Sequence, residues 1–253
     1  MWNLWDGWVW SSGWVATAAV ALVGASSHAM GLDVSPAIAA LAASGTLVVY
    51  TVDRLRDVVR DRTTAPARSA FIERHQGWLR VQAGAALLAA AAAAGFAGPR
   101  AVALAAGVAV LGLFHRRLKR FAWVKPAYLT LAWTAVCVGL PAVHAGDAQH
   151  VLPVVLVVGL TVQANVALSN LRDDEGLAAR LGRRRALVIA GGLLGLAAIC
   201  AGIGPTEVKP LLALPAAALP TVLFFRPTER YGGSIVDGAL VVGGALAWGL
   251  ATL

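Results

Sequence analysis

Long apolar runs, separated by short polar segments, cover most of this chain. Runs of about 17–22 apolar residues are long enough to cross a bilayer as helices. The pattern predicts nine such helices, over Val9–Met30, Ser35–Val52, Trp78–Ala97, Pro99–His115, Pro126–Ala145, Val151–Leu171, Ala186–Ile203, Pro210–Phe225 and Ser234–Leu253. Gly98-Pro99, Gly146-Asp147 and Gly204-Pro205 stand at three of the breaks, where helix-breaking residues are expected. We therefore expect an all-α, polytopic membrane protein.

Composition agrees with this class. Of 253 residues, 58% are hydrophobic and only 13% are charged, and the mean hydropathy is +0.71. A soluble domain of this length carries more charge, so a soluble protein is excluded and residues 1–253 are expected to form one transmembrane domain. Cys137 and Cys200 lie inside apolar runs without a CxxC pattern, which predicts small core side chains.

The basic residues predict the orientation of the chain. All 21 Lys and Arg residues except Arg100 and Lys209 fall in or beside the loops after the second, fourth, sixth and eighth runs. Positive residues gather on the cytoplasmic side of a membrane protein, which predicts a plasma-membrane protein with a cytoplasmic N-terminus and an external C-terminus. The net charge of +8 therefore indicates topology and contact with anionic lipid, and no nucleic-acid partner is expected.

A column of acidic residues follows the second run. Asp53, Asp57 and Asp61 are spaced i, i+4, i+8, so on a continuing helix they share one face. Stacked carboxylates repel one another unless a cation lies among them. The spacing therefore favours a divalent metal site on the side that carries the basic loops.

A second polar segment ends the sixth run. Asn165, Ser169 and Asp173 again follow the i, i+4, i+8 pattern, and Leu171-Arg172-Asp173 repeats Leu55-Arg56-Asp57 four runs later. The repeat suggests two four-helix halves plus a ninth helix, arranged around a central cavity. Asn165 lies within the apolar run, where an amide needs a partner; it lines a polar cavity wall or forms an interhelical hydrogen bond.

These two segments predict the chemistry of a site. Carboxylates without His or Cys favour Mg²⁺, which binds through one or two carboxylates and takes phosphate oxygens of a substrate as further ligands. The substrate is then expected to carry a diphosphate on a body that suits an apolar chamber. An isoprenyl diphosphate meets both requirements.

At this point the chain resembles the UbiA superfamily of intramembrane prenyltransferases, which has nine helices and Asp-rich motifs after the second and sixth. The first motif, usually NxxxDxxxD, is matched by Asp53, Asp57 and Asp61, with Asp in place of Asn. The second, which resembles NxRDxxGD, is matched by Asn170, Arg172, Asp173 and Gly176, but Leu177 replaces its final Asp. The basic segment from Leu118 to Lys125 resembles the family's loop between the fourth and fifth helices.

The resemblance implies a Mg²⁺-dependent transfer of an isoprenyl group to a lipophilic acceptor, a transferase of alkyl groups other than methyl, with its active site facing the cytoplasm. The expected metal ligands are Asp53, Asp57, Asp61, Asn170, Asp173 and Asp174, of which Asp57, Asp61 and Asp173 are central to catalysis. The expected diphosphate donors are Arg68, Lys119, Arg120 and Lys125, and the expected cavity wall includes Asn165 and Tyr128. No obligatory protein partner is indicated.

Three other functions fit parts of this pattern. An intramembrane terpene cyclase would ionise the same diphosphate, and the residues do not separate the two reactions. A transporter tends to place ionisable groups near the membrane midplane at broken helices, whereas these acids gather at one side. A non-catalytic membrane scaffold is compatible with Leu177 in place of the final Asp of the second motif.

Overall fold

The computed structural model describes residues 4–113, 124–173 and 176–252, and within these ranges the chain is helical with no strand. The first elements are α1 (Leu4–Trp10), α2 (Gly13–Ala29), α3 (Pro36–Asp61), α4 (Pro66–Arg74), α5 (Gln76–Ala97), α6 (Pro99–Leu113), α8 (Val124–Thr134), the π-helix η1 (Ala135–Gly139) and α9 (Leu140–Ala145). The remainder are α10 (Val151–Arg172), α11 (Gly176–Leu181), α12 (Arg183–Ile203), the 3₁₀-helix η2 (Thr206–Leu212), α13 (Ala213–Leu223), the π-helix η3 (Tyr231–Val236) and α14 (Asp237–Ala251).

The predicted class is confirmed: the chain is a multi-pass membrane protein. Among the described residues, six helical segments are long and apolar enough to cross a bilayer, and a seventh is obtained if α1 and α2, which meet at 69°, form one span. The exact number of nine is not confirmed. The predicted eighth run is divided between η2, which contains Pro210, and the 11-residue α13, and α6 has 15 residues.

Helix α3 shows how the sequence sets these elements. The Ser35 side chain accepts a hydrogen bond from the Ile38 N–H, and Pro36 occupies the first turn, where a missing N–H costs nothing. The helix then runs for 26 residues, or about 39 Å at 1.5 Å per residue. Because a hydrocarbon core is about 30 Å thick, its last turns, which carry the acidic column, extend beyond the apolar layer.

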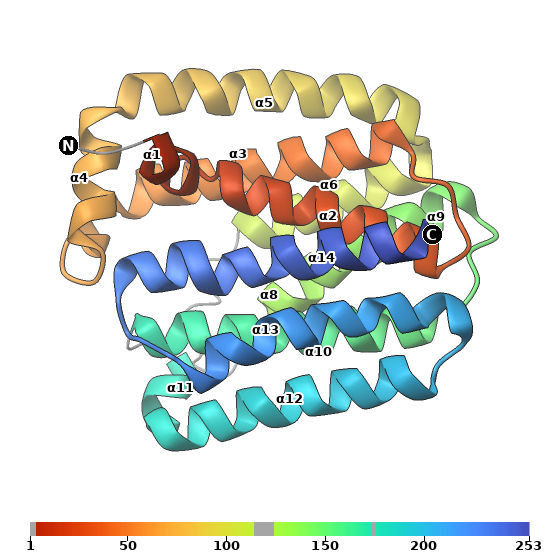
Figure 1. The fold of residues 1–253 in the computed structure, drawn as a ribbon. Coiled ribbons are helices and arrows are strands. Elements are labelled where there is room, and N and C mark those ends of the chain that lie inside the picture. The colour runs from red at the N-terminus through yellow and green to blue at the C-terminus, as the bar shows by residue number, and fades with distance from the viewer. Residues whose placement is uncertain (1–3, 114–123, 174–175, 253) are drawn as a thin grey trace.

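The helices pack in the order of the chain and close into a ring. α2 packs on α3, α3 on α5, α5 on α6, α6 on α8, α8 on α10, α10 on α12, α12 on α13, and α14 on both α13 and α2. The ends of α3 and α10 and the start of α12 lie at one end of this bundle, on the left in Figure 1, together with α1, α4 and α11. We call this the charged end. The C-terminal end of α14 lies at the opposite end of the bundle.

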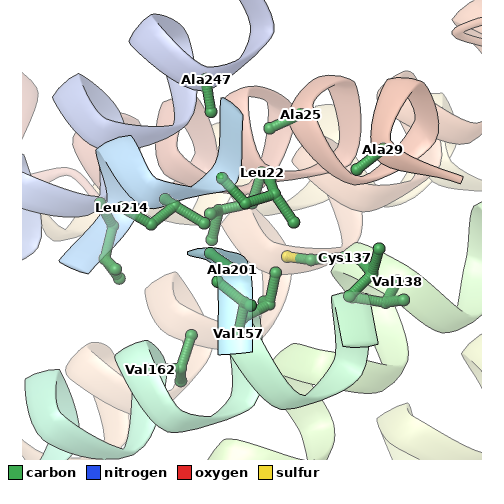
Figure 2. Close-up of a cluster of buried hydrophobic side chains, with 14 of the residues drawn as sticks. Leu22, Ala25, Ala29, Cys137, Val138, Val157, Val162, Ala201, Leu214 and Ala247 are labelled. Carbon is green, nitrogen blue, oxygen red and sulfur yellow. The ribbon is translucent and has the colours of Figure 1, made fainter. Parts of the chain in front are cut away.

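Small apolar side chains fill the centre of the bundle. Figure 2 shows Leu22, Cys137, Val157 and Leu214, from α2, η1, α10 and α13, converging with Ala201 of α12. Cys137 is fully buried and not in a disulfide, as predicted. Alanine, valine and glycine at such positions let helix backbones approach closely, which is how helices associate in a membrane.

Candidate functional site at the charged end

The acidic column of α3 has the predicted helical backbone. The helix continues without a break through Asp53, Asp57 and Asp61. Asp57 is 4% exposed and lies 3.9 Å from Arg60 in an ion pair, Asp61 is bonded to Arg68, and Asp53 is partly buried. The spacing has therefore placed three carboxylates on one stretch of helix at the charged end.

Helix α4 positions Arg68 against this column. Its terminal N–H group donates to a carboxylate oxygen of Asp61 at 2.9 Å. The first turn of α4 is held by Glu229, whose carboxylate accepts the backbone N–H groups of Ala67 and Arg68. Because a helix N-terminus favours a negative charge, Glu229 caps α4 from a distant part of the chain.

Arg68 retains donor capacity inside this arrangement. Its Nε atom and the neighbouring Ser69 hydroxyl are buried, and no described residue accepts or donates a hydrogen bond at either atom. A buried unsatisfied donor of this kind costs about 1–3 kcal/mol. A bound anion would supply the missing acceptor, which agrees with the predicted role of Arg68 toward a diphosphate.

The second acidic segment is organised by a pair of adjacent residues. The Arg172 guanidinium donates two hydrogen bonds to the Asp173 carboxylate, both at 2.7 Å. Arg172 is held close to the backbone of η3: a Cβ atom added to Gly232 would stand 2.2 Å from its terminal nitrogen. Burial raises the pKa of Asp173, but the hydrogen bonds and charge of Arg172, with the charges of Arg68 and Lys125, outweigh it and lower that pKa overall.

The same basic residues connect the two acidic segments. Arg68 is bonded to Asp61 of the first segment and acts electrostatically on Asp173 of the second. Lys125, 9% exposed at the start of α8, acts on Asp173 as well. Asp237, at the start of α14, interacts electrostatically with Arg68 and Arg172. The predicted residues Asp61, Arg68, Lys125 and Asp173 thus share one electrostatic neighbourhood.

Helix α1 lies over this end of the bundle and is fastened by arginines. Arg54 of α3 donates to the carbonyl oxygens of Val9 and Trp10 at 2.9 and 2.7 Å, which satisfies groups at the C-terminus of α1. Arg230, just before η3, pairs with the buried Asp6 at 2.9 Å. α1 therefore bridges the acidic helix α3 and the segment that leads into α14.

Other predicted residues have different surroundings. Asn165 donates to the Val236 carbonyl at 2.8 Å, which is an interhelical hydrogen bond between α10 and η3. Asn170 is buried beside a small cavity of about 60 Å³ between α8, α10, α11 and α12, and Tyr128 is buried on α8. Lys119, Arg120 and Asp174 lie outside the described residues.

A larger hollow lies away from these residues. A cavity of about 1270 Å³ is bounded by α1, α2, α3 and α5, with Trp5, Trp8, Trp78 and Gln82 among its lining residues. It is lined mainly by apolar atoms, and none of the predicted site residues that the structure describes borders it. This hollow is therefore separate from the acidic segments.

Metal binding depends on how these carboxylates are distributed. Within the described ranges, no three His, Cys, Asp or Glu side chains come together as a ready metal cage. Mg²⁺ commonly uses one or two protein carboxylates and completes its shell with water and phosphate oxygens. Asp57 and Asp61 lie on one helix, and Arg68 acts on both Asp61 and Asp173, so the described residues offer single carboxylates and no complete set of metal ligands.

Several structural residues of the site were not found by sequence reasoning. Glu229, Gly232 and Arg54 act through contacts 161, 60 and 45 residues away in the chain, and such pairs have no local pattern. For Glu229 and Arg54 the one signal in the sequence is a charged residue beside an apolar run, which applies equally to residues that only set topology; Gly232 has no such signal.

Comparison with known proteins addresses the fold. No protein-family model matches the sequence, and no curated protein matches it. The fold is similar to the solved structure described as "Structural and mechanistic insights into the biosynthesis of Digeranylgeranylglyceryl phosphate synthase in membranes", with a TM-score of 0.56 and 17% identity over 94% of each chain. That protein is described as a digeranylgeranylglyceryl phosphate synthase that works in membranes. The chain thus shares the helical membrane fold of that protein over nearly its whole length.

Proposed function

We propose that this protein transfers an isoprenyl group from an isoprenyl diphosphate to a lipophilic acceptor within the membrane. The observation that carries the proposal is the likeness to the prenyltransferase fold over 94% of both chains. The charged end supports it, because Asp57, Asp61 and Asp173 lie at the helix ends that correspond to the two motifs of the resemblance.

The basic residues supply the grip on a diphosphate. Arg68 has a buried Nε donor without an acceptor among the described residues, and Lys125 is buried nearby in the same field. Guanidinium and ammonium groups bind phosphate oxygens strongly when water is excluded. As the allylic carbon–oxygen bond breaks, these donors stabilise the negative charge that develops on the leaving diphosphate.

Asp57, Asp61 and Asp173 would hold Mg²⁺, with Asp53 and Asn170 as further candidates. Mg²⁺, when bound, would neutralise charge on the diphosphate. Without a ligand, the carboxylates of Asp57, Asp61 and Asp173 are paired with Arg60, Arg68 and Arg172. A bound diphosphate would offer these arginines phosphate oxygens instead, which would free the carboxylates to bind Mg²⁺.

The acceptor meets the isoprenyl group in an apolar setting. The charged end adjoins helices whose buried faces are alanine, valine and leucine, and a low-water environment protects a reactive carbocation from hydrolysis. On α8, the Trp133 indole donates to the Tyr50 hydroxyl at 2.9 Å, which fixes two aromatic rings between α8 and α3. Aromatic ring faces of this kind can shield a cation.

We place the charged end on the cytoplasmic side of the plasma membrane, because nearly all the Lys and Arg residues gather at the loops on that side of the predicted topology. A water-soluble or peripheral supplier of isoprenyl diphosphate would then reach the charged end directly.

The test is a turnover assay on the purified full chain in lipid nanodiscs. Isoprenyl diphosphates of graded length are supplied with Mg²⁺ and a membrane extract as the source of acceptor, and pyrophosphate release and prenylated lipid are measured. We expect release that depends on Mg²⁺ and stops with EDTA. Absence of pyrophosphate release with every chain length would contradict the proposal, and release with a cyclised product and no acceptor would indicate the cyclase reaction.

A further inference from the structure

A group of exposed arginines lies at the charged end but outside the network described above. Arg183, Arg184 and Arg185 open α12, and Arg226 follows α13; we call these four the arginine patch. All four are exposed. Among the described residues, no carboxylate lies within ion-pair distance of any of them. This differs from Arg60, Arg62, Arg68, Arg172 and Arg230, each of which pairs with a carboxylate.

One contact assembles the patch from two parts of the chain. The Arg183 guanidinium donates to the Phe225 carbonyl at 3.0 Å and lies 5.7 Å from the centre of the Phe225 ring. The buried Phe225 ring in turn packs edge-on against Tyr231. The contact fixes the start of α12, which carries Arg184 and Arg185, beside the segment that follows α13 and carries Arg226. The patch is therefore a built surface rather than a loose run of charge.

The local structure gives these cations no internal compensation. Three arginines occupy the first turn of a 21-residue helix, where the helix dipole disfavours positive charge. Gly182 precedes them with no side-chain cap, and no acidic residue lies in the first turn. Helix formation alone would favour acidic residues here, so the patch is a cost to the isolated fold that an external anion would offset.

The depth of the patch identifies the anion. Val188 and Ile189 of α12 are 68% and 45% exposed and lie one helical turn, about 5 Å, beyond Arg185. Leu223 and Phe224, which precede Arg226, are 67% and 71% exposed. Exposed apolar residues on a membrane helix face lipid tails, so the guanidinium groups lie at the level where phospholipid phosphates begin.

We propose that the arginine patch binds the phosphate groups of anionic phospholipids, and that this is a lipid site separate from the acidic segments. Guanidinium groups bind phosphate oxygens in pairs, and basic pockets between transmembrane helices hold anionic headgroups. A phosphate held at the start of α12 also accepts from the free N–H groups of its first turn. The proposal does not depend on the prenyl transfer reaction.

The test measures lipid retention on the full chain. The protein is reconstituted in nanodiscs of mixed phosphatidylcholine and phosphatidylglycerol, and native mass spectrometry counts the lipids that it retains after release into detergent. The variant Arg184→Gln/Arg185→Gln is compared with Arg100→Gln/Lys209→Gln, which removes the same charge from exposed residues outside the basic loops. We expect the patch variant to lose about fivefold in phosphatidylglycerol binding per arginine removed, and the matched control to keep it.

Four outcomes would overturn the proposal. Equal retention of phosphatidylglycerol by the two double variants would show that only the net charge of the protein matters, not the position of the arginines. Retention of phosphatidylcholine and phosphatidylglycerol in equal amounts would indicate ordinary boundary lipid. Competition by inorganic phosphate at low millimolar concentration would indicate a site for a soluble anion. A patch variant that unfolds at a lower temperature in pure phosphatidylcholine would indicate a structural role, because we expect unchanged or slightly higher stability there.

Discussion

The arginines of α3 and α4 and the arginines of α12 have similar sequence surroundings but different roles. At the end of α3 and in α4, three arginines donate to groups of the protein. Arg54 donates to carbonyl oxygens of α1, Arg62 to the carboxylate of Glu73 and Arg68 to the carboxylate of Asp61. At the start of α12, Arg184 and Arg185 point into the surroundings. Both sets satisfy the rule that positive charge marks one side of a membrane protein.

The difference separates arginines that belong to a candidate functional site from arginines that only mark one side of the membrane. The arginines at the end of α3 and in α4 come with acidic residues at helical spacing. We call the partly buried pairs Asp61–Arg68 and Asp173–Arg172 the inward network, because their acids and bases balance one another. The outward arginines have no acidic companions within their helix. A charge that a fold buries requires a partner, so partly buried acid–base pairs such as Asp61–Arg68 point to a site, whereas exposed arginines without carboxylates point to contact with an external anion.

The contrast between the two groups of arginines depends most on whether the two acidic segments serve one reaction. Asp57→Asn and Asp173→Asn should each lower pyrophosphate release by about 100-fold or more, since each removes a charge that positions or neutralises the leaving group. Rates are measured with saturating Mg²⁺ and isoprenyl diphosphate.

The matched control is Glu73→Gln, which makes the same chemical change at a carboxylate paired with the exposed Arg62 on the same end of the molecule. We expect near-normal turnover from it. If Asp173→Asn retains normal turnover while Asp57→Asn does not, only the first acidic segment is part of the reaction.

A second experiment tests whether Arg172 belongs to the inward network. Gly232→Ala would place a methyl group 2.2 Å from the Arg172 guanidinium, whose side chain is only 11% exposed and is bonded to Asp173. Displacement of a packed side chain by one added carbon costs about 1–3 kcal/mol, and we expect a loss of unfolding free energy of that size together with reduced turnover.

The control lies in the next residue of the same π-helix. At Gly233 an added Cβ meets only a terminal methyl group of Val9, at 3.2 Å, which can shift. Gly233→Ala should therefore change unfolding free energy and turnover much less. Equal effects of the two variants would mean that η3 tolerates no alanine for backbone reasons, and that Arg172 is not the cause.

A third experiment concerns the fastening of α1. Arg54→Met keeps an unbranched apolar stem but removes the guanidinium group and both hydrogen bonds to the C-terminal carbonyls of α1. Hydrogen bonds from charged groups contribute about 1.5–3 kcal/mol, so hydrogen exchange within residues 4–10 should become roughly tenfold faster or more. Arg80→Met, at an exposed position of α5, should leave that exchange unchanged; equal acceleration by both would show that α1 is held by other contacts.

Much of the fold could be predicted from the sequence, because helix formation in a membrane follows local rules. The apolar runs gave the helical class, and the i, i+4, i+8 spacing correctly predicted that α3 continues through Asp61. The number of spans could not be predicted with the same success. Pro210 draws the start of the predicted eighth run into the 3₁₀-helix η2, so α13 has only 11 helical residues.

The site was predictable only as far as its residues share a helix. Asp57 and Asp61 follow from spacing, whereas the placement of Arg68 depends on Glu229 capping α4 from 161 residues away. Asn165 is a similar case. Its position within an apolar run predicted that it needs a hydrogen-bond partner, but only the structure identifies that partner as the Val236 carbonyl. Long-range pairing is set by packing, which a single sequence does not encode in any short pattern.

The smallest predicted effect is a change of stability with pH at the second acidic segment. The pKa of Asp173 is lowered in the folded protein because the bonds and charge of Arg172, with Arg68 and Lys125, outweigh burial. An unfolded Asp takes up its proton near pH 4, while the folded carboxylate remains ionised to lower pH. The unfolded state therefore binds more protons in that range, and the stabilisation from Asp173 is lost as the pH falls.

The measurement compares unfolding temperatures of the wild type and Asp173→Asn in nanodiscs across a pH series. We expect a constant difference above about pH 5 that shrinks below about pH 4. In an Arg172→Gln background the same comparison should give a smaller difference at every pH, because the bidentate partner is absent. A difference that is independent of pH down to the point of acid unfolding would mean that Asp173 stabilises the protein by packing rather than by charge, and the inward network would then consist of Asp61 and Arg68 without the second segment.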